Sequence, residues 1–119
     1  MTPHFKKAEL ACKCGCGMLP AQSFMDKVET LRLAFGKPMP VNSAARCPFH
    51  NANVSGTGAD GPHTTGRAID LGVRGADAFE VVRLALLLGF TGIGVAQKGA
   101  SRFIHIDDLV TGRPTIWSY

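Results

Sequence analysis

Two stretches of the chain, residues 23–35 and 77–88, carry apolar residues at the 3.6-residue spacing of an amphipathic helix. A glycine follows each stretch, and Gly36 and Gly89 are expected to end the helices because glycine readily adopts a left-handed backbone. Each helix would present one apolar face to a core. In the first helix this face consists of Phe24, Val28, Leu31 and Phe35.

Four shorter stretches are typical of β-strands: residues 39–43, 67–73, 91–96 and 102–107. A turn near Lys98 and Gly99 joins the last two. The order helix, strand, strand, helix, strand, strand predicts an α+β fold. We expect a small, mainly antiparallel sheet and two main helices packed around a metal site. Residues 44–53 and 54–62, which lack apolar periodicity, are expected to form loops.

The composition is that of one packed domain. A chain of 119 residues is too short for two independent cores. Hydrophobic residues make up 45% of the sequence and charged residues 18%, which excludes a disordered chain. We therefore expect residues 1–119 to form a single domain and to act as a monomer.

The net charge of +4 is spread along the chain and not gathered into blocks. It is compatible with nucleic acid, but equally with an anionic polymer such as a bacterial cell wall. The longest apolar run, residues 84–88, is too short to cross a membrane, and the N-terminus lacks an apolar signal segment. We expect synthesis in the cytoplasm and neither a membrane nor a nucleic-acid partner.

The four cysteines leave two interpretations open. Cys12, Cys14 and Cys16 lie in the run Cys-Lys-Cys-Gly-Cys-Gly, and Cys47 follows much later. This spacing is not that of the paired Cys-x-x-Cys motifs of a zinc ribbon. The cysteines either hold a structural zinc through four thiolates or form disulfides or free thiols, and reduced thiols are the rule in the cytoplasm.

Three residues have the chemistry and the placement of metal ligands. Catalytic zinc usually takes three nitrogen or oxygen ligands and leaves a position for water. Asp70 lies in the strand predicted over residues 67–73, and His105 in that over 102–107, each on the face away from the apolar side chains. His63 ends a glycine-rich loop. Taken alone, each His would suit a surface or core position and the Asp a turn, but an acidic side chain within an apolar strand needs a partner. Together they predict a zinc site.

These residues resemble those of a known family. His63, with Asp70 seven positions later and a His-x-Asp at His105 and Asp107, resembles the zinc D-alanyl-D-alanine carboxypeptidase family of cell-wall peptidases. Residues 42–51, Asn-Ser-Ala-Ala-Arg-Cys-Pro-Phe-His-Asn, are similar to the family's Ser-Gly-Tyr-Arg-Cys-Pro-x-His-Asn. The N-terminal segment with its clustered cysteines resembles small phage and prophage members. The resemblance extends from about Phe5 to Trp117.

The resemblance implies a zinc cofactor held by His63, Asp70 and His105, in a fold shared with the zinc site of hedgehog signalling domains. Three departures stand out: Ala44-Ala45 replaces Gly-Tyr, Gly61 replaces a frequent Ser, and Arg102 occupies the position at which several relatives have an acidic general base. The first two imply a changed fit to substrate. The third leaves the identity of the base open.

Peptide hydrolysis needs a carboxylate that takes a proton from water and returns it to the leaving amine. Asp107, on the same strand face as the third ligand, is the first candidate for this base, and Asp108 is the second. Asp107 would equally serve as the acceptor for the free N–H of a ligand imidazole. The resemblance implies that Arg46 binds a substrate carboxylate or a developing oxyanion. Trp117 and Tyr119 either flank a groove or close the core.

The leading hypothesis is a zinc metallopeptidase that hydrolyses stem-peptide bonds of bacterial peptidoglycan next to D-amino acids, as an endolysin or a D,D-carboxypeptidase does. Such an enzyme would reach the cell wall after release by a holin or by lysis. A second hypothesis is a catalytically inactive, zinc-containing cell-wall binding module, as the absence of an acid at Arg102 permits. A third is a nucleic-acid binder built on a thiolate-bound zinc.

Overall fold

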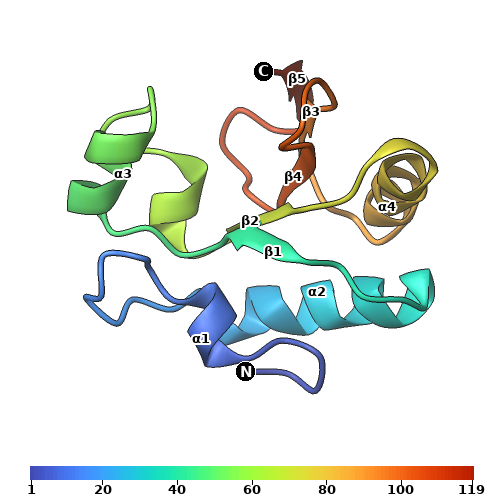
Figure 1. The fold of residues 1–119 in the computed structure, drawn as a ribbon, viewed down its shortest axis with the longest axis horizontal. Coiled ribbons are helices and arrows are strands. Elements are labelled where there is room, and N and C mark those ends of the chain that lie inside the picture. Colours follow the sequence, from blue (N-terminus) through green and yellow to red (C-terminus); the bar gives the residue numbers. More distant parts are fainter.

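The computed structural model describes residues 1–119 and has the predicted α+β architecture (Figure 1). Its helices are α1 (Lys7–Leu10), α2 (Gln22–Phe35), α3 (Pro48–Val54) and α4 (Gly75–Leu87), together with a short 3-10 helix, η1 (Pro62–Thr65). Its strands are β1 (Val41–Ser43), β2 (Ala68–Leu71), β3 (Gly92–Ala96), β4 (Phe103–Asp107) and β5 (Thr115–Ser118). No helix combines the length and the apolar character needed to cross a membrane.

The strands form one sheet in the order β1-β2-β4-β3-β5. Every neighbouring pair is antiparallel except β3 and β5, which run parallel. This mostly antiparallel sheet confirms the predicted fold class. Strand β4 lies in the middle of the sheet, with hydrogen-bonded neighbours on both sides, and is therefore a rigid support for side chains.

Helices α2 and α4 build the hydrophobic core with the sheet. Ile69 of β2, Ile106 of β4 and Ile93 of β3 lie side by side in register and are all buried. Phe24 of α2 and Val81 of α4 belong to the same buried cluster. Figure 1 shows α2 running along the sheet and α4 beside it, whereas α3 lies at the other end of the molecule. One face of the sheet is thus committed to the core.

A second row of residues crosses the sheet in register, one position away along each strand. Asp70 of β2 pairs with His105 of β4, His105 with Gly94 of β3, and Gly94 with Trp117 of β5. Because successive side chains of a strand point to opposite faces, this row lies on the face away from the isoleucines. The polar face of the sheet therefore carries two of the three predicted ligands.

Four elements differ from the sequence-based expectation, and one of them is η1, which begins at Pro62, the last residue of a predicted loop. Helix α3 occupies part of a predicted loop, because Pro48 suits the first turn and the Cys47 sulfur accepts the backbone N–H of His50. Strand β5 was not predicted, since it follows Pro114 and has no alternating apolar pattern. Helix α1 is a single turn, too short for periodicity to reveal.

Candidate metal centre

Three side chains from separate elements meet on the polar face of the sheet. His63 comes from η1, Asp70 from β2 and His105 from β4, and all three are buried. Asp70 Oδ1 lies 3.2 Å from His63 Nε2 and 3.1 Å from His105 Nδ1. Their donor atoms all lie within 4.8 Å of one another, a separation that a single metal ion can bridge. The structure thus brings together the three residues that the sequence singled out as ligands.

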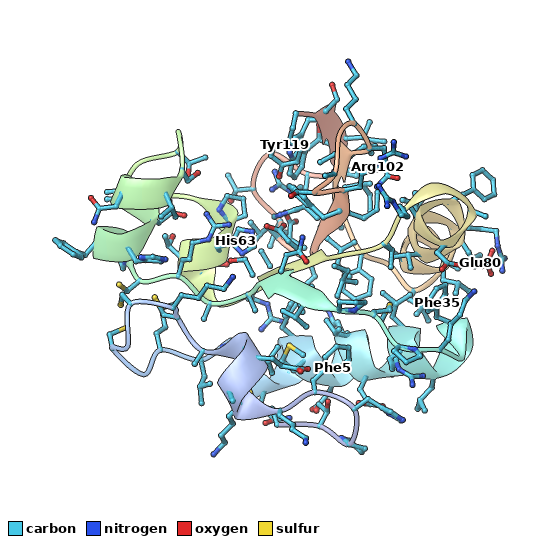
Figure 2. All side chains as sticks on the ribbon, viewed as in Figure 1. Phe5, Phe35, His63, Glu80, Arg102 and Tyr119 are labelled. Carbon is cyan, nitrogen blue, oxygen red and sulfur yellow. The ribbon has the colours of Figure 1, made fainter.

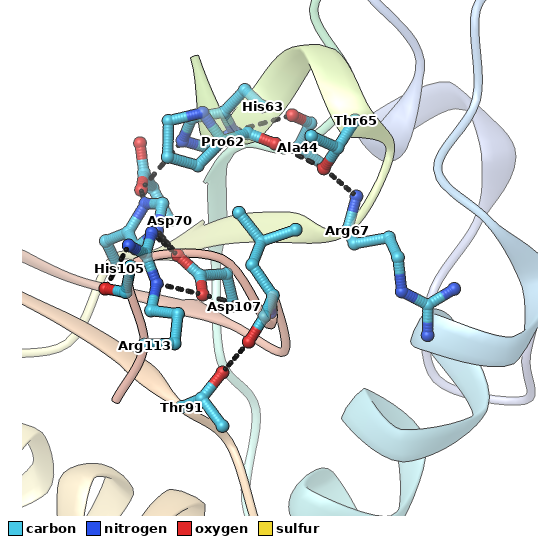
Figure 3. Close-up of polar contacts among 12 residues, drawn as sticks. Ala44, Pro62, His63, Thr65, Arg67, Asp70, Thr91, His105, Asp107 and Arg113 are labelled. Carbon is cyan, nitrogen blue, oxygen red and sulfur yellow. Dashed lines mark hydrogen bonds and ion pairs between the residues drawn. The ribbon is translucent and has the colours of Figure 1, made fainter. Parts of the chain in front are cut away.

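The second nitrogen of each imidazole is hydrogen-bonded to the protein. His63 Nδ1 lies 2.7 Å from the carbonyl oxygen of Ala44, and His105 Nε2 lies 2.8 Å from Asp107 Oδ2 (Figure 3). Both oxygens are acceptors, so in the neutral rings these nitrogens carry the protons. The other two nitrogens face the Asp70 carboxylate, and a proton or a cation must lie between them and the carboxylate to prevent repulsion between lone pairs. A bound cation satisfies this arrangement, and two imidazoles with one carboxylate suit catalytic zinc.

The pKa values of Asp70 and His105 show that the buried carboxylates need positive charge nearby. Burial alone would raise the pKa of Asp70, but hydrogen bonds with His105 and His63 outweigh it and hold that pKa at about 2. Burial alone would lower the pKa of His105, but its hydrogen bonds with Asp107 and Asp70 raise that pKa above its ordinary value. Protons or a metal ion must therefore balance the buried carboxylates.

Asp107 is enclosed behind His105. Its side chain is 0% exposed, and Arg113 donates to both of its oxygens, Nε to Oδ1 at 2.9 Å and Nη2 to Oδ2 at 2.7 Å. The backbone N–H of Leu109 donates to Oδ1 as well. Burial would raise the pKa of Asp107, but Arg113 and His105 hold it well below its ordinary value. On β3, Gly92 lies so close that a Cβ there would collide with this carboxylate.

A cavity of about 510 Å³ opens over the three ligands. The Trp117 ring forms one wall, 4.9 Å from the His105 ring between centroids, and the Arg113 guanidinium lies 5.1 Å from the Trp117 ring centre. Tyr119 also lines the cavity and is 64% exposed, which places it at the rim. Residues 54–57 line another part. Of the two roles open to the terminal aromatic residues, this geometry favours flanking a groove.

Arg46 reaches the centre from the segment between β1 and α3. Its Nη2 lies 3.5 Å from Asp70 Oδ2, its Nη1 donates to Asn51 Oδ1 at 3.0 Å, and its Nε donates to Ser43 Oγ at 3.1 Å. The side chain is 13% exposed and lines the cavity. A guanidinium has five N–H groups, so Arg46 can keep these contacts and still donate to a ligand in the cavity.

The structure does not bring the candidate bases into the cavity, where Asp70 has the only carboxylate side chain. The buried Asp107 carboxylate is occupied by His105 and Arg113. Asp108 is paired with Arg67 and Lys27, away from the ligands. This geometry favours the orienting role of Asp107 over the role of base.

Two further acidic residues, Glu80 and Asp60, and the Arg102 position also lie outside the cavity. Glu80 pairs with Arg83 on α4, and Arg102 donates to the carbonyl of Gly99 in the turn before β4. Figure 2 shows both side chains apart from His63. Asp60 is an exposed loop residue.

Three site residues were not singled out from the sequence. Arg113 lies in a loop whose path the pattern does not predict, and its contacts with Asp107 and Trp117 are seen only in the structure. Gly92 and Gly94 leave room for the groups that face them: a Cβ on Gly94 would lie 2.9 Å from the Cβ of His105. The sequence could have indicated the role of these glycines, because two glycines in a short apolar strand are typical of a place where other groups approach closely.

Comparison with known proteins agrees with this arrangement. No curated protein matches the chain closely enough to count as a relative. The family described as Peptidase M15, in contrast, matches residues 3–107, a range that contains all three ligands and Arg46. This family is one of peptidases, and the match covers most of the 119 residues. The chain therefore belongs to the peptidase M15 family.

Proposed function

We propose that this protein is a zinc peptidase that hydrolyses stem-peptide bonds of bacterial peptidoglycan next to D-amino acids. The observation that carries the proposal is the buried group of His63, Asp70 and His105, whose donor atoms converge beneath an open cavity. Membership of the peptidase family supports hydrolysis of a peptide bond. The donor set supports zinc, because three ligands of this kind leave a position open.

Some residues of the chain would hold the metal ion, and others would hold the substrate. Zinc, when bound, would supply the Lewis acidity that activates water and polarises the scissile carbonyl. Ala44 and Asp107 fix the orientation of the two imidazoles through the hydrogen bonds to their outer nitrogens. Arg46 lines the cavity, where it would bind a substrate carboxylate or the developing negative charge.

The cavity suits a short peptide with an anionic group. Arg46 and Arg113 supply positive charge to its lining, and Trp117 and Tyr119 supply flat apolar surface. Stem peptides of peptidoglycan carry free carboxylates together with small apolar side chains. The net charge of +4 adds a general attraction to an anionic wall. We extend the proposal to a monomeric, endolysin-like protein that reaches the wall after release, without a membrane or nucleic-acid partner.

The test is digestion of purified peptidoglycan, followed by mass spectrometry of the soluble fragments. We expect new fragments that end at a D-amino acid, their loss with a chelator and their return with added zinc. His63→Ala and His105→Ala should abolish both cleavage and one equivalent of bound zinc. His50→Ala removes an imidazole that lies outside the ligand set, so it should retain both. Cleavage that persists in either ligand variant would contradict the proposal.

The absence of a second carboxylate side chain from the cavity favours one alternative, a cell-wall binding module that keeps the metal centre without hydrolysis. The same digestion separates the two functions when a pull-down on insoluble peptidoglycan is run beside it. Zinc-dependent retention on the peptidoglycan with no released fragments would support the module. Fragment release with turnover supports the peptidase.

A further inference from the structure

The four cysteines form a second cluster, separate from the metal centre. The Sγ atoms of Cys12, Cys14, Cys16 and Cys47 all lie within 4.8 Å of one another. Cys12 and Cys14 approach to 3.4 Å, and Cys14 and Cys47 to 3.6 Å. Three of these residues come from the N-terminal segment and the fourth from a position 31 or more residues later, so the fold itself brings the thiols together.

Local backbone geometry directs the sulfurs to one point. Gly15 and Gly17 have φ values of 85° and 87°, which are left-handed conformations that glycine adopts without strain. They bend the chain after Cys14 and after Cys16, and the space around them is otherwise empty, so their role is conformational. On the other side, Cys47 immediately precedes α3, whose first residue is a proline. The turn and the helix start face each other across the cluster.

The sulfur separations fit a shared metal ion and not a disulfide. A disulfide needs a sulfur–sulfur distance of about 2.0 Å. Four thiolates about 2.3 Å from a tetrahedral zinc lie about 3.8 Å apart, close to the separations of Cys14 from Cys12 and from Cys47. Two sulfurs also accept backbone N–H groups, Cys12 from Cys47 and Cys47 from His50, each at 3.4 Å. Such donors stabilise the negative charge of thiolates.

We propose that Cys12, Cys14, Cys16 and Cys47 bind a structural zinc ion as four thiolates. Four protein ligands leave no open position, so this site holds the fold together and takes no part in hydrolysis. It links the N-terminal segment to the chain on either side of Cys47. Arg46, which contacts the metal ligand Asp70, is the residue directly before Cys47. The thiolate site therefore helps to place Arg46 at the cavity wall.

The first experiment counts metal in the full chain, purified without chelator after growth with zinc. We expect about two zinc ions per chain in the wild type and about one in the Cys14→Ser/Cys16→Ser double variant. Both side chains are exposed, so serine there should not disturb the core. Lys13→Ser, a change in the same turn that removes no ligand, should keep both ions. An unchanged zinc content in the cysteine variant would overturn the proposal.

The second experiment identifies the ligands. Cobalt bound by four thiolates absorbs strongly in the visible and shows sulfur-to-metal charge transfer in the near ultraviolet. We expect this spectrum in a His63→Ala/His105→Ala variant and its loss in the cysteine variant. Denatured, chelated protein without reductant should titrate as four thiols. Fewer thiols, or no charge-transfer band, would overturn the proposal.

The two sites can fail separately. Loss of zinc from the cysteine variant, together with full zinc in the histidine variant, would support the thiolate site and refute the metal centre of the proposed function. Loss of zinc in the histidine variant alone would support that centre and refute the thiolate site. The outcome for either site does not depend on whether peptidoglycan is cleaved.

Discussion

The chemistry of the candidate metal centre depends on how the imidazoles of His63 and His105 are held. Each donates its outer N–H to a fixed oxygen, the carbonyl of Ala44 for His63 and the carboxylate of Asp107 for His105. These hydrogen bonds select the tautomer and point the free lone pair at the proposed metal position. Arg113 in turn keeps Asp107 ionised. The site is therefore prepared to receive a cation before one binds.

Asp107→Asn tests whether this carboxylate orients His105 or acts as a base. We expect zinc affinity to fall about 10- to 100-fold, because the imidazole loses a charged acceptor. Activity should fall with it and recover in large part when excess zinc saturates the site. Zinc titrations of activity, with bound metal measured in parallel, give the answer. Unchanged zinc affinity with turnover lost at every zinc concentration would instead show that Asp107 is the base.

Arg46→Ala should reduce turnover by about 100- to 1,000-fold, the usual effect of removing a donor to developing negative charge. Its zinc content should remain that of the wild type, since Arg46 contacts Asp70 but supplies no lone pair to the metal. Arg102→Ala is the matched control, because that guanidinium lies outside the cavity. Equal losses in the two variants would mean that general positive charge, and not the position of Arg46, assists the reaction.

At the scale of single residues, strand alternation was enough to predict the face of Asp70, His105 and Asp107, because side chains of a strand alternate whatever the sheet order. The surroundings of Asp107 were not predictable. Its enclosure depends on Arg113, which arrives from a later loop, and on Gly92, which leaves the space that the carboxylate fills. Such contacts between distant segments leave no local pattern in the sequence.

At the scale of elements, an ion-pair group joins α2 to the end of β4. Asp108 is 3% exposed in its side chain and accepts hydrogen bonds from Arg67 and from Lys27 of α2. Arg67 also donates to Ser23 of α2. Because the partners bring charge to a nearly buried carboxylate, they hold the pKa of Asp108 below its ordinary value, although burial alone would raise it.

Asp108→Asn should lower the free energy of unfolding by about 1–3 kcal/mol at neutral pH, as is usual for lost hydrogen bonds to a charged group. A carboxylate with a lowered pKa stabilises the fold above its ordinary pKa of about 3.9 and loses this contribution as the pH falls toward its lowered pKa. The difference between wild type and variant should therefore shrink below about pH 4.

Urea unfolding of both proteins between neutral and acidic pH measures this difference. Glu80→Gln is the control, because Glu80 forms an exposed pair with Arg83, and loss of this pair should leave the free energy of unfolding close to that of the wild type at every pH. A difference between Asp108→Asn and the wild type that stays constant with pH would contradict the assigned ion pair.

The predicted helices correspond to α2 and α4 because both bury an apolar stripe against the sheet, and Gly36 ends α2 in the left-handed conformation expected of it. The missed elements lack such a stripe. Helix α3 has one buried residue, Asn51, and β5 pairs only at the edge of the sheet. Both depend on contacts with the rest of the fold, yet α3 and β5 supply parts of the cavity wall.

At the scale of the whole molecule, the two proposed metal sites join different parts of the chain. The site of His63, Asp70 and His105, here called the histidine site, links η1, β2 and β4. The thiolate site links the N-terminal turn to the start of α3. A ligand that binds only the folded state adds to stability according to its free concentration. Each site should therefore make the folding free energy of the entire domain depend on free zinc.

The free energy of unfolding, plotted against the logarithm of free zinc, should rise by about 1.4 kcal/mol per tenfold increase for each site once zinc exceeds its dissociation constant. Two sites predict a slope of about 2.8 kcal/mol in the wild type. Urea unfolding in zinc buffers measures it, with His50→Ala as the control that keeps both sites. The slope should halve in His63→Ala/His105→Ala and in Cys14→Ser/Cys16→Ser, because each removes one site. A slope near zero in the histidine variant would eliminate the thiolate site, and an unchanged slope there would eliminate the histidine site.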